Sequence, residues 1–105
     1  MTAVVSIVKH AGVFAEDKDA AAEIRKTVVL PAVGRNELVT LDFADVRVVT
    51  QSFIHALISQ ALRQGGEAAL DVMVFKNCSP FVRGIIETVV QYTLDSQDMS
   101  REDSQ

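Results

Sequence analysis

The pattern of hydrophobic and polar residues divides the chain into six elements. Short runs rich in β-branched residues predict strands at residues 4–8, 38–43 and 70–75. Apolar residues three and four positions apart predict helices at about residues 18–30 and 53–64, and from residue 80 onward. The order β-α-β-α-β-α predicts an α/β domain. We expect a mixed or parallel sheet of three to four strands, with about three helices.

Particular residues mark the expected ends of these helices. Asp17 is placed to cap the first helix, and Pro31 should end or kink it because proline has no backbone N–H. Gly65-Gly66 predicts the end of the second helix, and Ser79-Pro80 predicts the start of the third. The periodicities predict a shared core that includes Val39, Leu41, Phe43, Leu57, Ile58, Val72, Val74, Ile85 and Val89.

Composition indicates one packed domain in a chain of 105 residues, of which 49% are hydrophobic. We expect this domain at residues 1–94, followed by a disordered acidic tail at 95–105. The formal net charge of −4 argues against a nucleic-acid partner, and no apolar run is long enough for a membrane span. A single cysteine and no recognisable signal peptide predict a cytoplasmic protein.

Three polar residues near strand ends form a candidate ligand site. Asp42 lies near the carboxyl end of the middle strand, where open α/β sheets bind ligands, and Lys76 and Asn77 follow the third strand. Asp45 could pair with Asp42, but no His, Glu or third carboxylate stands near, so turn and hydrogen-bonding roles are favoured. Cys78 has no adjacent His or Asp, which favours an inert thiol. We therefore predict no metal, no cofactor and no enzyme activity.

The hydroxyl of Ser52 is the other candidate for function. It lies just before the helix predicted from Phe53, where it could cap free N–H groups or carry a phosphate that the helix dipole favours. Capping is the favoured role, with Thr50 as a competing cap. His55 and Ser59 share the helix face of Ser52, which is either a solvated surface or a partner-binding edge.

The residues around Ser52 resemble a known family. The run from Val39 to Phe53 follows the pattern V-x-L-D-F-x-x-V-x-x-x-T-x-x-F of the STAS-like domain family of unknown function (DUF4325), and the resemblance covers roughly residues 13–94. More distantly, the chain is similar to STAS domains of bacterial anti-sigma factor antagonists. Those have D-S-S-G where this chain has Thr50-Gln-Ser-Phe53, so Ser52 falls on the serine that a partner kinase phosphorylates. Residues 73–83 resemble their S-P-x-V-x-x junction.

The resemblance implies a non-catalytic regulatory module of STAS-like type that binds a protein partner, such as a histidine-kinase-like ATPase or an anti-sigma-type kinase. The expected contact surface consists of Thr50, Gln51, Ser52, His55 and Ser59. The alternative is a domain that senses a small molecule or nucleotide at Asp42, Lys76 and Asn77.

Overall fold

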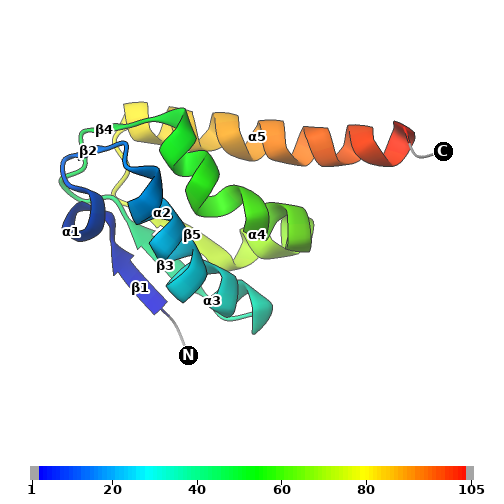
Figure 1. Ribbon diagram of the computed structural model, residues 1–105, viewed down its shortest axis with the longest axis horizontal. Helices are drawn as coiled ribbons and strands as arrows, with labels where there is room; N and C mark the ends of the chain where they lie inside the picture. Colours follow the sequence, from blue (N-terminus) through cyan, green and yellow to red (C-terminus); the bar gives the residue numbers. More distant parts are fainter. Residues whose placement is uncertain (1–2, 104–105) are drawn as a thin grey trace.

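The main sheet has three parallel strands in the order β1-β3-β5 (Figure 1). A computed structural model describes the backbone of residues 3–103 and the side chains of residues 3–96. The strands are β1 (Ala3–Ser6), β3 (Val39–Asp42) and β5 (Met73–Lys76). The predicted α/β class is confirmed, and of the two expected kinds of sheet, mixed or parallel, the structure has the parallel one, because all of the described pairings are parallel.

Four helical units accompany the strands in the described part of the chain, one more than the sequence predicted. They are α1 (Ile7–Ala11), the continuous run of α2 (Lys18–Ile24), the π-helix η1 (Arg25–Val29) and α3 (Leu30–Gly34), then α4 (Gln51–Val72) and α5 (Pro80–Asp103). The connections from β1 to β3 and from β3 to β5 each lead to the next strand in the same direction across the sheet. Because such connections are right-handed, α2–α3 and α4 lie on one face. Figure 1 shows α5 running across the top of the molecule, where it contacts α4.

A second sheet, which the sequence did not predict, joins β2 (Phe14–Ala15) to β4 (Val48–Val49) in parallel. Strands of two residues are too short for a period-two pattern to be visible. The pairing ends with a hydrogen bond from the Thr50 N–H to the Ala15 carbonyl, at 3.1 Å. Because α2 and α4 begin just after these strands, the small sheet brings their N-termini close together.

The helix expected to end or kink at Pro31 instead continues through it to Gly34. The five residues before Leu30 form a π-helical turn, which adds one residue to the repeat just ahead of the proline. The next buried residue after Ile24 is therefore Val29, five positions later. Val28, which the four-residue spacing placed in the core, is only half-buried.

The third strand begins three residues later than predicted, because α4 continues to Val72. In this register Met73 and Phe75 face the helices, whereas Val74 is 41% exposed. The prediction that Val72 and Val74 are buried is therefore wrong, since a shift of one position reverses the two faces of a strand. At the first strand, residues 7–8 likewise belong to α1.

Helical geometry is interrupted at Gly66, as the predicted stop at Gly65-Gly66 indicated, and α4 consists of two helical stretches that meet there at a kink. The Gly66 backbone angles of φ 59° and ψ −140° are not helical, yet helical residues follow as far as Val72. The predicted apolar stripe of this helix is confirmed, and it is buried at Phe53, Ile54, Leu57, Ile58, Ala61 and Leu62.

The final helix, α5, occupies the C-terminal part of the chain. It begins at Pro80 as predicted, with the Ser79 hydroxyl accepting from the Val82 N–H at 3.1 Å. The backbone of α5 runs on to Asp103 and so enters the segment 95–105 predicted as an acidic tail. The side chains from residue 97 onward are outside the part of the chain that the structure describes, so the predicted tail is not tested there.

Candidate functional site

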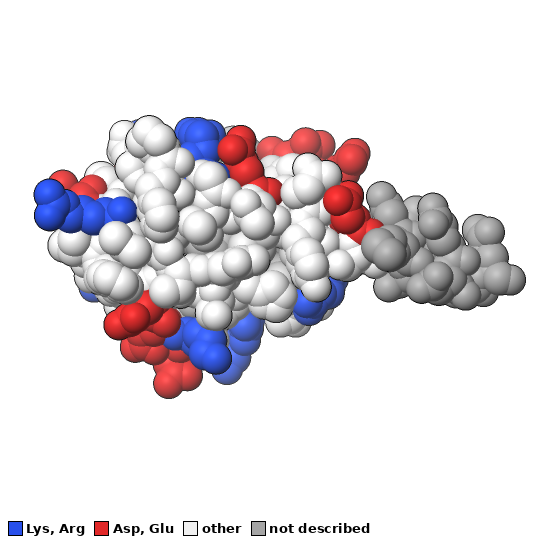
Figure 2. Space-filling model, turned by 90° about the horizontal axis from the view of Figure 1, so that it is seen from above, with Lys and Arg blue, Asp and Glu red and all other residues white. Residues whose placement is uncertain are grey.

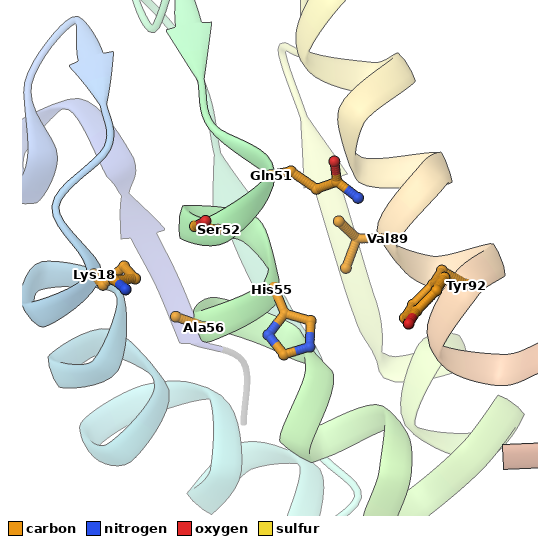
Figure 3. A pocket seen from close by; sticks show the side chains of 7 residues that line it. All are labelled: Lys18, Gln51, Ser52, His55, Ala56, Val89 and Tyr92. Atoms are coloured by element: carbon orange, nitrogen blue, oxygen red, sulfur yellow. The ribbon is translucent and has the colours of Figure 1, made fainter. Parts of the chain in front are cut away.

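An open cavity of about 580 Å³ lies where the start of α2, the first turns of α4 and the side of α5 meet. Its lining residues are Lys18, Gln51, Ser52, His55, Ala56, Val89 and Tyr92. Figure 3 shows Lys18 on one side, Tyr92 on the other and His55 between them. We call this the α4–α5 cavity. It contains three of the five predicted partner-binding residues, namely Gln51, Ser52 and His55.

Two capped helix N-termini define one end of the α4–α5 cavity. The Asp17 carboxylate accepts from the Asp19 N–H at 2.9 Å, which confirms the predicted cap of α2. The Thr50 hydroxyl accepts from the Phe53 N–H at 3.1 Å, so Thr50 is the cap of α4. The prediction that Ser52 is the cap is wrong, because α4 begins two residues earlier than the apolar pattern indicated.

Ser52 is thereby left exposed in the first turn of α4, with its hydroxyl free of the capping role. The N–H groups of Gln51 and Ser52 have no carbonyl one turn behind them, as at the start of any α-helix. Together with the helix dipole, these groups favour negative charge at this end of the cavity. The exposed ammonium group of Lys18, on the neighbouring helix, adds positive charge.

His55 points into the middle of the α4–α5 cavity (Figure 3). Its Nε2 lies 3.2 Å from the Arg63 guanidinium, two turns further along α4. A guanidinium can only donate hydrogen bonds, so Nε2 is the acceptor in this contact. The other ring nitrogen, Nδ1, is left for a ligand or a partner.

The predicted partner-binding surface and the lining of the cavity are not the same set of residues. Ser59 is only 4% exposed, so it does not belong to the solvent-facing surface on which it was expected. Lys18, Val89 and Tyr92 were missed, and Tyr92 is 63% exposed at the edge of the cavity. They lie more than 30 residues from Ser52 along the chain, and no local pattern connects them to it.

The position of the cap gives a first prediction. Replacing Thr50 by alanine should lower the free energy of unfolding by about 0.5–2 kcal/mol, because the Phe53 N–H loses its acceptor. Replacing Ser52 by alanine should change it by no more than about 0.5 kcal/mol, as at ordinary exposed positions. Urea unfolding of both variants measures the difference. A larger loss for Ser52→Ala than for Thr50→Ala would show that the cap has been assigned to the wrong residue.

The residues of the alternative ligand site, Asp42, Lys76 and Asn77, lie together in a hydrogen-bonded cluster at the end of the main sheet. Asp42 Oδ1 accepts from Asn77 Nδ2 at 3.0 Å and from the Ala44 N–H at 2.9 Å. Lys76 pairs with Asp42 in the strand register, and its carbonyl accepts from the Phe43 N–H. The three predicted residues are therefore together, but the carboxylate is used to hold β3 and β5.

The same cluster predicts a dependence of stability on pH. The hydrogen bond from Asn77, then that from Ala44 and the charge of Lys76, hold the pKa of Asp42 below its ordinary value. Since this pKa is lower in the folded state, the stabilisation is complete above the unfolded pKa of about 4 and is lost as the pH falls below it. Both Asp42→Asn and Asn77→Gly should weaken the decrease in unfolding free energy between about pH 4 and pH 2. Asn77 has φ 58°, so glycine fits its backbone. An unchanged pH profile in both would contradict this role.

Other kinds of site are not seen in the described residues. Among them, no three His, Cys, Asp or Glu side chains are grouped so that they could hold a metal ion. None of the helices in that part of the chain is long and apolar enough to span a bilayer.

A comparison with known families agrees with the resemblance around Ser52. The family model described as "STAS-like domain of unknown function (DUF4325)" matches residues 20–83, more than half of the chain. No curated protein and no solved structure gave a match. The matched segment includes the small sheet's β4, both Thr50 and Ser52, and the start of α5. The chain therefore belongs to the STAS-like domain family DUF4325.

Proposed function

We propose that this protein is a non-catalytic regulatory module of the cytoplasm that binds a protein partner over the α4–α5 cavity. The observation that carries the proposal is the exposed hydroxyl of Ser52, which lies beside Lys18 and His55 in an open cavity but has no role in capping. The cavity is open to solvent, which suits a partner's side chain better than an enclosed substrate.

The surface next to the cavity supports a protein partner. Phe81, Ile85, Thr88 and Tyr92 follow one another at helical spacing along α5, and Phe81 and Tyr92 are well exposed. Figure 2, which views the molecule from the α5 side, shows a largely uncharged area with charged side chains towards its edges. Exposed aromatic residues within an uncharged centre are typical of protein interfaces.

Regulation at this surface would come from phosphorylation of Ser52. A phosphate here would meet the free N–H groups of the first turn and the Lys18 ammonium, so the fold would tolerate its charge. The same charge would alter the surface offered to the partner. A partner that transfers phosphate, such as a histidine-kinase-like ATPase or an anti-sigma-type kinase, fits this arrangement and the family resemblance.

The alternative function, sensing a small molecule or nucleotide at Asp42, Lys76 and Asn77, has less support. The Asp42 carboxylate already accepts two hydrogen bonds within the protein. None of these three residues lines the α4–α5 cavity, and none lines a second cavity that lies beside Cys78.

The first test identifies the partner from the docking surface. A photo-crosslinking amino acid placed at Tyr92 in the producing cells should trap a specific protein, which mass spectrometry identifies. The same group at Lys26, which is exposed but lies outside the cavity, is the control. Equal capture from both positions would contradict a docking surface at the α4–α5 cavity.

The second test measures regulation with the partner so identified. Ser52→Asp should keep the parent's melting temperature and weaken partner binding by at least about tenfold, which is the effect of about 1.4 kcal/mol. Thr27→Asp places the same charge on an exposed helical position outside the cavity and should bind as the parent does. If Ser52→Asp folds and binds like the parent, phosphorylation of Ser52 does not control this interaction.

A further inference from the structure

A second cavity, of about 380 Å³, lies on the other side of α5 from the α4–α5 cavity. It is lined by Leu70, Phe75, Cys78, Arg83, Ile86, Glu87, Val90 and Gln91. At about 3.6 residues a turn, Arg83, Glu87 and Val90 share one side of α5, and Val89 and Tyr92 lie on another. We call it the Cys78 cavity. Because it is separate from the proposed docking surface, a ligand could bind here whether or not a partner docks at the α4–α5 cavity.

The inner wall of the Cys78 cavity is apolar and comes from three elements. Leu70 belongs to the last turn of α4, Phe75 to β5, and Ile86 and Val90 to α5. Ile86 is buried and the other three are half-buried, so they have apolar surface left to cover. A cavity of this size is at the small end of the range for ligand sites, about 300–1,000 Å³.

Two charged side chains line this cavity, Arg83 and Glu87, and Arg83 is the one that can bind an anion. Among the described side chains, Arg83 forms no ion pair with a carboxylate. The ion pair found there joins Arg35 to Glu37. The Gln91 amide group is engaged, because it donates to both oxygens of Asp95 at 3.2 and 3.3 Å. A guanidinium binds a carboxylate through two parallel hydrogen bonds, a geometry that an ammonium group lacks.

Cys78 lies close enough to Arg83 to sense its charge. Burial raises the pKa of the Cys78 thiol, and the positive charge of Arg83 opposes that increase only in part. The thiol is therefore protonated at neutral pH, which leaves Arg83 without a thiolate partner. As the chain's single cysteine, Cys78 is also a built-in reporter of this cavity.

We propose that the Cys78 cavity binds a small organic acid whose apolar body packs against Leu70, Phe75, Ile86 and Val90. Its carboxylate pairs with Arg83. The size of the cavity suits a chain of the length of octanoate, and Glu87, which also lines the cavity, disfavours acids that carry a second negative charge near the first.

The experiment uses the full chain with octanoate as the probe, and octylamine and octanol as probes of equal length but different charge. Octanoate should slow the alkylation of Cys78 by iodoacetamide in a saturable way, because it covers the thiol. Octanol, which lacks the charge that pairs with Arg83, should protect more weakly, and octylamine should give no protection. No protection by octanoate, or equal protection by octanol or octylamine, would overturn the proposal.

Variants separate binding at Arg83 from a general effect of fatty acids. Arg83→Gln should weaken octanoate binding by at least about tenfold, the effect expected for a lost charged hydrogen bond. Arg47→Gln removes the same charge at an exposed site outside the cavity and should bind as the parent does. Circular dichroism establishes that each variant is folded. Unchanged binding by Arg83→Gln, or an equal loss in both variants, would overturn the assignment of the carboxylate to Arg83.

Discussion

Replacing Leu57 by alanine is expected to lower the free energy of unfolding by about 2–5 kcal/mol. Leu57 is fully buried in the apolar stripe of α4 and belongs to the apolar core cluster. Truncation removes its transfer free energy and leaves a cavity, because tightly packed neighbours relax only in part. Denaturant unfolding followed by circular dichroism measures the change.

Leu38→Ala is the matched control for this prediction. Leu38 precedes β3 and is 45% exposed, so the same truncation should change the free energy of unfolding by no more than about 0.5 kcal/mol. Similar losses at Leu57 and Leu38 would mean that α4 does not pack on the sheet as described.

A second large effect is expected at the bend of α4. Gly66→Ala should destabilise the protein by roughly 1–3 kcal/mol, because φ 59° with ψ −140° is a conformation that residues with a side chain avoid. The cost comes from the backbone alone, since a Cβ at Gly66 would meet no atom within 4 Å. Thermal and urea unfolding both report it.

Gly84 supplies a control of opposite sign. It lies in the interior of α5 with ordinary helical backbone angles, and a Cβ there would also meet nothing within 4 Å. Gly84→Ala should therefore stabilise the protein by about 0.5–1 kcal/mol, through the higher helix propensity of alanine. A stabilising Gly66→Ala would contradict the bend and favour a straight helix through residue 66.

The candidate site shows where prediction from sequence reaches its limit. The pattern identified Gln51, Ser52 and His55, because a strand followed by a helix start is a local signal. It left Ser52 and Thr50 as competing caps, since the first apolar residue, Phe53, was taken as the start of the helix. Hydrogen bonding places the start at Gln51 and the cap at Thr50. Such a shift of two residues is common where polar residues open a helix.

By itself, the sequence determined the α/β class, the buried stripe of α4 and membership of the family. These depend on periodicities and motifs contained within single segments. Only the tertiary structure decided that β2 pairs with β4, that Val74 faces outward, and that Lys18 and Tyr92 line the same cavity as Ser52. Each of these depends on contacts between segments far apart in the chain, whose register is set by packing and leaves no local pattern.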